Sequence, residues 1–208
     1  GLSTLYHPRS CVHGYTASKS HITGASMHVR QHLCLKLDLK DFFPSIHYGR
    51  VRGVLRAPPF ELNPYAAAVV AKLCVYWNGS GQSELPQGAP TSPILSNIIC
   101  KGLDNDLILF AKKHRLVYTR YADDLTFSTD RRVLPASVAI IPTVQGQRTE
   151  IGEDLRKIIA RAGFEINDRK VRLVRSTDRQ RVTGLVVNEK LNLPREFIRN
   201  TRAILNNW

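Results

Sequence analysis

The 208-residue sequence has no apolar run of about 18 residues or more, so no membrane-spanning helix is expected. It also has no charged-then-apolar start of the secretory kind, no internal repeat and no low-complexity tract. Cysteine is scarce: four cysteines lie far apart, without a Cys-x-x-Cys pair or a histidine at zinc-finger spacing. This pattern argues against a disulfide framework or a zinc finger and favours free thiols in a reducing cytoplasm.

Acidic residues are few compared with basic ones. Thirty Lys and Arg against seventeen Asp and Glu give a net charge of +13. A surface this basic attracts polyanions, although generic solubility charge is the alternative. Aromatic residues lie near several basic clusters, which suits a channel that holds a nucleic-acid backbone and stacks bases (Phe110, Tyr118, Tyr121 and Phe164). Composition does not distinguish RNA from DNA.

Apolar periodicity predicts a mixture of helices and strands. Strands are expected at 33–38, 116–120, 125–128, 165–166, 171–174 and 182–187. Helices are expected at 45–56, 64–75, 92–110, 149–162 and 194–206, with Ser45 and Asn63 as N-caps and Gly163 as a terminator. Without a regular βαβ rhythm, the order predicts an α+β domain with a mainly antiparallel sheet packed on helices.

Three aspartates occupy positions suited to metal-assisted phosphoryl transfer. Asp38 closes an apolar strand, while Asp123 and Asp124 lie in a hairpin between two short strands. Two Mg²⁺ ions roughly 3.5–4 Å apart, bridged by carboxylates from neighbouring strands, can neutralise the attacking and leaving oxygens. Taken alone, an Asp pair in a turn is usually solvated turn chemistry.

The motifs around these acids resemble those of bacterial reverse transcriptases. Leu37–Ile46 (LDLKDFFPSI) is similar to the first catalytic-Asp motif of that family. Leu85–Pro93 (LPQGAPTSP) is similar to the nucleotide-pocket motif, and Tyr121–Asp124 (YADD) to the catalytic hairpin. The motifs occur in the family's order over nearly the whole chain. The resemblance implies a right-hand polymerase palm with partial fingers, acting as an RNA-directed DNA polymerase.

The resemblance also implies a catalytic set. Asp38, Asp123 and Asp124 would bind two Mg²⁺ ions, or Mn²⁺, with the carbonyl of Leu39 as an extra ligand. Lys170 matches the basic residue near the pyrophosphate leaving group, where an ammonium stabilises charge or donates a proton. A solvated lysine is the alternative for Lys170.

A second implied set contacts the incoming deoxynucleotide. Phe43 matches the bulky residue that excludes the 2′-hydroxyl, and the backbone amides of Asp41 and Phe42 match positions beside the triphosphate. Gln87 matches a nucleotide-contacting residue, and Gly88 shapes its loop. The alternatives are core packing, which we expect for one of the two phenylalanines, and a plain helix-entry turn for Gly88.

Two further elements are similar to those of retron-type reverse transcriptases. The triplet Val182, Thr183, Gly184 matches a Val-Thr-Gly element that follows the palm in that group. Upstream, Ala25 and His28 fit an Asn-Ala-x-x-His element, although Gly24 replaces the Asn. The resemblance implies RNA-binding roles for both elements, and a structural histidine is the alternative for His28.

The resemblance divides the chain into a partial fingers segment (1–33), the palm (34–193) and the start of a thumb or a connection helix (194–208). Family members carry a basic fingers hairpin upstream and a thumb downstream. We therefore expect the full parent enzyme to be active and the 208 residues alone to be weak or inactive.

The implied partners are an RNA template, the RNA/DNA duplex, deoxynucleoside triphosphates, a structured noncoding RNA and an effector protein of antiphage defence. Another bacterial defence enzyme or a group II intron enzyme is an alternative within the family. A noncatalytic RNA-binding palm scaffold is the alternative outside it. The clustered aspartates argue against the scaffold, because carboxylates without metal repel phosphate.

Overall fold

The computed structural model describes residues 2–140 and 149–206. The helices are α1 (Leu2–Leu5), α2 (His21–Ser26), α3 (Tyr48–Arg56), α4 (Pro64–Cys74), α5 (Ser92–Ile99), α6 (Lys101–His114), α7 (Glu153–Arg161) and α8 (Arg195–Asn206). The strands are β1 (Leu33–Asp38), β2 (Tyr76–Trp77), β3 (Ser83–Glu84), β4 (Val117–Tyr121), β5 (Asp124–Thr129), β6 (Ala139–Ile140), β7 (Glu150–Ile151), β8 (Arg172–Arg175), β9 (Arg181–Val182) and β10 (Leu185–Val186).

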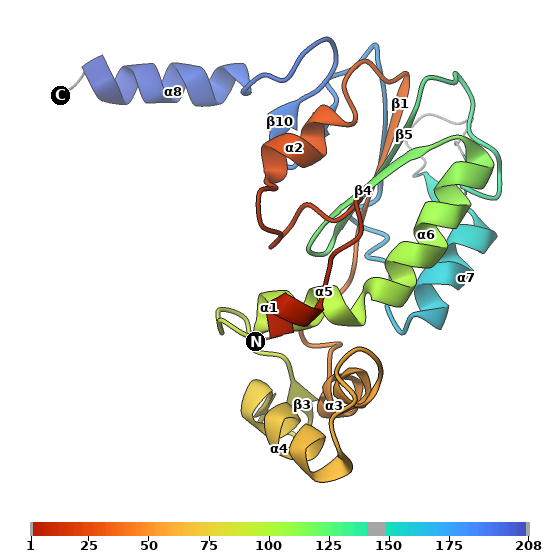
Figure 1. The fold of residues 1–208 in the computed structure, drawn as a ribbon. Helices are drawn as coiled ribbons and strands as arrows, with labels where there is room; N and C mark the ends of the chain where they lie inside the picture. Colours follow the sequence, from red (N-terminus) through yellow and green to blue (C-terminus); the bar gives the residue numbers. More distant parts are fainter. Residues whose placement is uncertain (1, 141–148, 207–208) are drawn as a thin grey trace.

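A four-stranded sheet in the order β4-β5-β1-β8 forms the centre of the fold (Figure 1). Each neighbouring pair in it is antiparallel. This confirms the predicted α+β class with an antiparallel sheet. The alternation of apolar and polar residues in 33–38 predicts a half-buried strand, but this is wrong for β1, because only Lys36 in it is partly exposed. As a central strand, β1 is covered on both faces over most of its length.

Helices α6 and α7 lie side by side against one face of the sheet (Figure 1). Every second side chain of β1 points toward this face, and these side chains are buried leucines (Leu33, Leu35 and Leu37). The buried residues of α6 and α7 complete the same core cluster (Leu103, Leu107, Phe110, Leu155 and Ile159). This core holds the strands in place from behind and leaves the opposite face for polar side chains.

The long helix predicted from Ser92 is broken in two. Cys100 lies between α5 and α6, and its backbone N–H bonds to carbonyls only two and four residues back. The spacing of the apolar residues already indicates this break, because Ile98 and Leu103 are five residues apart. An α-helix has about 3.6 residues per turn, so a step of five residues goes well past one full turn. On one straight helix these two side chains would therefore point in different directions.

Several predicted boundaries also differ. Helix α3 begins at Tyr48, with the imidazole of His47 as N-cap; Ser45 donates instead to the Phe42 carbonyl. The predicted strand at 182–187 is two strands joined by a turn, and 165–166 contributes only a bridge between Ile166 and Leu39. Residues 150–151 form β7 rather than helix. Asn63 caps α4 and Gly163, at φ +75°, follows α7, both as predicted.

The N-terminal segment adds to the sheet beside β4. Val12 forms a parallel bridge with Arg120, and the His13 N–H donates to the Arg120 carbonyl at 2.9 Å. In return the Arg120 N–H donates to the carbonyl of Cys11 at 2.9 Å. Part of the segment predicted as fingers is therefore hydrogen-bonded to a strand of the palm. The domain boundaries themselves stay a prediction.

The other face of the sheet is covered at one end by a small apolar cluster. Ala25 of α2 and Cys34 of β1 pack with three residues of the β9–β10 hairpin (Val182, Leu185 and Val187). The far end of this face, where β1 and β4 finish, carries the aspartates. The four cysteines are free and buried, as predicted.

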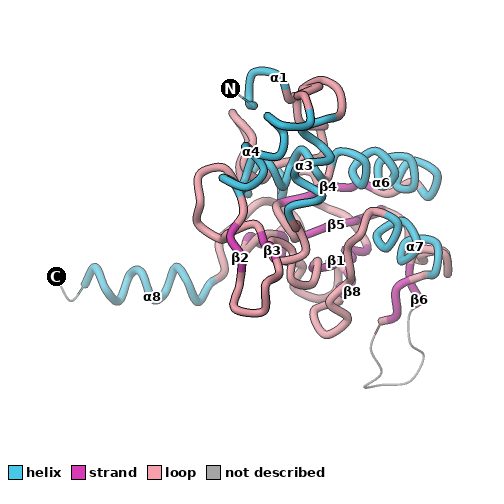
Figure 2. Tube along the Cα trace, turned by 90° about the horizontal axis from the view of Figure 1, so that it is seen from below, coloured by secondary structure: helices cyan, strands magenta, loops and turns pink. Residues whose placement is uncertain are grey.

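Helix α8 extends away from the rest of the fold (Figure 2). None of its residues is buried. Among residues 2–140 and 149–206, no helix combines the length and apolar character needed to cross a membrane.

Candidate active site

Two of the aspartates lie directly opposite each other on neighbouring strands. Asp38 at the end of β1 pairs with Asp124 at the start of β5, and Asp124 pairs with Tyr121 at the end of β4. Cross-strand partners project from the same face of a sheet. The register therefore forms a transverse row, Tyr121–Asp124–Asp38, on the face opposite α6 and α7.

Asp123 lies in the tight turn that joins β4 to β5. Ala122 before it has a φ of +55°, an uncommon value for a residue with a side chain, and is buried. The Asp123 carbonyl accepts from the Leu39 N–H at 3.1 Å, which ties the turn to β1. Within the described chain, the Leu39 carbonyl accepts no hydrogen bond. The role of this oxygen as a metal ligand stays a prediction.

A lysine reaches the row from the loop before β8. The Lys170 ammonium donates to an Asp38 carboxylate oxygen at 2.8 Å, while its side chain stays 61% exposed. The hydrogen bond with Asp38, together with that charge, raises the pKa of Lys170. The structure thus brings Lys170 to the acids, as the predicted catalytic set requires. An ion pair this exposed contributes little stability, so the ammonium can exchange Asp38 for another anion at little cost.

The pKa values of Asp123 and Asp124 are both raised. Burial raises the pKa of Asp123, and the charges of Asp124 and Asp38 raise it further. Burial also raises the pKa of Asp124, with Asp38 acting in the same direction and Lys36 and Lys170 opposing it. Clustered acids with raised pKa values are typical of sites that receive a cation.

The predicted nucleotide-binding residues lie on two loops. After β1, the Phe42 ring is buried and stacks on Phe164 with 5.5 Å between centroids, whereas Phe43 is partly exposed. One phenylalanine is therefore core, as expected. Asp41 beside them is exposed, with a φ of +44°. Gln87 and Gly88 are exposed in the loop between β3 and α5. Their contacts with a nucleotide stay predictions.

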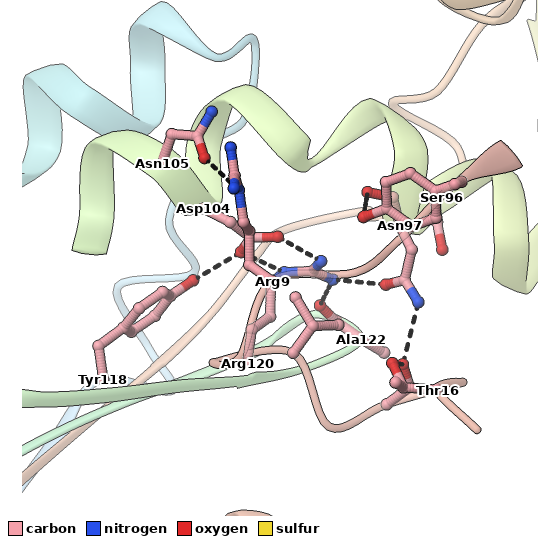
Figure 3. A network of polar contacts seen from close by, with 12 residues as sticks. Arg9, Thr16, Ser96, Asn97, Asp104, Asn105, Tyr118, Arg120 and Ala122 are labelled. Atoms are coloured by element: carbon pink, nitrogen blue, oxygen red, sulfur yellow. Dashed lines mark hydrogen bonds and ion pairs between the residues drawn. The ribbon is translucent and has the colours of Figure 1, made fainter. Parts of the chain in front are cut away.

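A buried ion pair behind the turn that holds Asp123 was not predicted. The Arg120 guanidinium bonds both oxygens of Asp104, at 2.8 and 2.7 Å, and both side chains are fully buried (Figure 3). Arg120 also donates to the Asn97 side-chain oxygen at 3.1 Å and to the Ala122 carbonyl at 3.2 Å. Tyr118 donates to Asp104 at 3.1 Å. The network connects α5 and α6 to the turn that holds Asp123.

The two predicted RNA-binding elements meet in space. Ala25 and His28 are fully buried, and Val182 is nearly so. The Thr183 hydroxyl donates to the His21 carbonyl of α2 at 3.1 Å, and Gly184 is exposed at φ +88°. Their RNA contacts stay predictions. Of these residues, Thr183 and Gly184 are the ones with surface to offer.

His28 is internal to the sheet face. Its two ring nitrogens lie 2.6 Å from the Ser128 hydroxyl and 2.8 Å from the Thr119 hydroxyl. Burial, with a smaller effect of His13, lowers the pKa of His28 to about 4. A neutral ring linking β4 and β5 accounts for the histidine at this position.

The fold should therefore lose stability as the pH falls from the ordinary histidine pKa toward the lowered pKa of His28. The unfolded chain takes up the proton near the ordinary value of 6.5, but the folded chain only near pH 4. Acidification between these values favours unfolding by up to ~1.4 kcal/mol per pH unit. Urea unfolding at pH 7 and pH 5 should show a smaller loss in a His28→Gln variant than in wild type. Equal losses in both proteins would refute the assignment; exposed His32→Gln is the control.

Comparison with known proteins agrees with this geometry. A family model described as reverse transcriptase (RNA-dependent DNA polymerase) matches residues 2–187. The chain belongs to the reverse transcriptase family. It is 38% identical to the retron Mx65 reverse transcriptase of Myxococcus xanthus over 93% of its length, and 35% identical to the retron Ec86 reverse transcriptase of Escherichia coli over 91%. These relatives confirm the retron-type prediction. The chain spans 45% and 53% of their lengths.

A solved structure shows the same fold at low sequence identity. Telomerase from Candida albicans, in complex with a fragment of telomeric RNA, matches 82% of the chain with a TM-score of 0.50 and 14% identity. The matched part is 33% of the telomerase chain. The likeness shows that the chain shares the fold of that part of the telomerase chain, with a sheet packed on helices.

The donor set fits the divalent metal ions that reverse transcriptases use. The donors of the row are all oxygens, which Mg²⁺ prefers, and the repulsion among the carboxylates would be relieved by a cation. Within residues 2–140 and 149–206, no three acidic, His or Cys side chains are grouped so that they could hold a metal ion by themselves. Mg²⁺ sites at phosphates commonly use one or two carboxylates and complete the shell with water and substrate oxygens.

Proposed function

We propose that the chain forms the nucleotidyl-transfer centre of an RNA-directed DNA polymerase that adds deoxynucleotides to a primer 3′-hydroxyl. The observation that carries the proposal is the pairing of Asp38 with Asp124 across β1 and β5, with Asp123 in the adjoining turn. These carboxylates and the Leu39 carbonyl would hold two Mg²⁺ ions, or Mn²⁺. Bound there, the metals supply charge neutralisation at the attacking and leaving oxygens.

The remaining residues of the site position the substrate. The Lys170 ammonium, now on Asp38, would pair with the leaving pyrophosphate and supply its proton. The partly exposed Phe43 ring, held edge-on against Phe42 with 5.2 Å between centroids, would lie under the sugar and exclude a 2′-hydroxyl. The backbone amides of Asp41 and Phe42, and the Gln87 side chain, would contact the nucleotide.

The proposed template is RNA, and the product an RNA/DNA duplex. The net charge of +13 supports a polyanionic partner. The relatives are named retron reverse transcriptases, which supports a structured noncoding RNA as the natural template. By the same resemblance we propose a cytoplasmic enzyme that works with an effector protein in antiphage defence.

The test is incorporation of labelled dTTP on a poly(rA)/oligo(dT) substrate with Mg²⁺. It uses the 208 residues and, in parallel, the full product of the same gene. We expect incorporation by the full product that disappears when Asp123 and Asp124 are both replaced by Asn. Replacement of dTTP by UTP should reduce incorporation, because Phe43 would exclude the 2′-hydroxyl of the ribose.

Two outcomes would contradict the proposal. Binding of the duplex without incorporation by either protein would indicate a noncatalytic RNA-binding scaffold. Incorporation that survives the double Asp→Asn replacement would show that the carboxylates of the row do not carry the chemistry.

A further inference from the structure

A second tyrosine extends the row beyond Tyr121. Tyr121 lies on the same face as Asp124, its partner in the β4–β5 register. The Tyr15 ring lies next to it, with 6.3 Å between ring centroids and planes inclined by 38°. Tyr15 is 47% exposed, so its ring has free surface next to Tyr121. Burial raises the pKa of the Tyr15 phenol, and Tyr121 and Asp123 raise it further.

The backbone before Tyr15 is pressed against the catalytic turn. A Cβ atom on Gly14 would lie 2.7 Å from the Ala122 backbone nitrogen, so only glycine fits there. The Gly14 carbonyl accepts from the Asn97 amide at 3.0 Å, which anchors this loop to the Arg120 network. Tyr15 itself has a φ of +55°.

This conformation is costly for a tyrosine and needs a reason. Asn and Gly adopt a left-handed φ most readily, whereas a bulky aromatic residue rarely does. Backbone strain held by surrounding contacts is concentrated at functional sites. The ring is not needed for the core, because nearly half of the residue is exposed. The strained loop therefore presents an aromatic surface at the edge of the carboxylate row.

We propose that Tyr15 binds the 3′-terminal nucleotide of the primer, its ring continuing the surface of Tyr121. The inference rests on the proposed polymerase function, which requires the primer 3′-hydroxyl to lie at the aspartates. Aromatic rings stack on bases whatever the sequence, and a polymerase must accept any terminal base. Tyr15 and Tyr121 lie where that base has to be held.

The first experiment measures affinity without chemistry. Fluorescence anisotropy of a labelled RNA/DNA primer–template duplex, with Ca²⁺ and no nucleotide, should show roughly 5- to 150-fold weaker binding for Tyr15→Asn, as expected for one lost stacking contact. Asn removes the ring and tolerates a positive φ, so the loop is retained. Tyr15→Phe should bind within about twofold of wild type, because it keeps the aromatic face. Tyr65→Ala, at an 81% exposed position on α4, is the matched control.

The second experiment locates the contact. A 2-aminopurine at the primer 3′ terminus should be more strongly quenched by wild type than by Tyr15→Asn, whereas the same probe several nucleotides upstream should show no difference. Equal affinity and equal terminal quenching in wild type and Tyr15→Asn would overturn the Tyr15 proposal. The proposed polymerase function would not be affected by that result. Wild-type binding without any incorporation would instead overturn the proposed function.

Discussion

Asparagine in place of Asp124 should lower nucleotide incorporation roughly a thousandfold or more and, at the same time, make the fold more stable at pH 7. The loss of activity follows from removing a carboxylate that faces Asp38 across the sheet. Incorporation is measured with the poly(rA)/oligo(dT) substrate. The same replacement at Asp130, an exposed acid after β5, is the control and should change neither property.

The gain in stability follows from the raised pKa of Asp124. The folded chain holds the proton more tightly than the unfolded chain, whose value is near 3.8, so the ionised carboxylate destabilises the fold at neutral pH. That cost is removed as the pH falls through the folded pKa. Urea unfolding should therefore give a higher free energy of unfolding for the Asn variant than for wild type at pH 7, and a smaller difference at pH 4. An Asn variant less stable than wild type at pH 7 would contradict this account.

Replacing Arg120 by Met should destabilise the fold by about 3–5 kcal/mol. The methionine leaves Asp104 as an uncompensated charge in a fully buried position. It also removes the hydrogen bonds to Asn97 and to the Ala122 carbonyl. Chemical denaturation measures the loss, with Arg132→Met at an exposed position as control. A variant as stable as wild type would show that the pair is dispensable.

A double variant separates the charge from the support of the turn. Replacing Asp104 by Leu together with Arg120→Met removes both charges, so much of the stability should return. The bond to the Ala122 carbonyl stays lost. Incorporation by the double variant should therefore remain below wild type even where its unfolding free energy recovers. Full recovery of both properties would limit the network to a folding role.

The face that carries the aspartates was predictable because its signals are local. A period-2 apolar strand that ends in Asp38, and a short hairpin around Asp123 and Asp124, determine which residues meet once the strands pair. The register that aligns Asp38 with Asp124 is fixed by the buried leucines of β1. The predicted carboxylate cluster followed from these patterns together with the family motifs.

The supporting structure was not predictable in the same way. Arg120 looks like one more cation in a basic chain, and nothing near it in the sequence indicates a buried carboxylate on α6. The pairing of Val12 with Arg120 joins distant parts of the chain, whereas propensity and periodicity describe only neighbours. The break at Cys100 is an exception, because the five-residue step from Ile98 to Leu103 already indicates it in the sequence.

The parallel bridge between Val12 and Arg120 has a consequence for the order of folding. Closing so long a loop costs entropy that is recovered only after the contact forms, which makes such pairings late and slow. During synthesis from the N-terminus, Gly14 must wait for the β4–β5 hairpin before it can dock on Ala122. The Gly14–Tyr15 segment can therefore reach its place beside the turn that holds Asp123 only after that hairpin has been made.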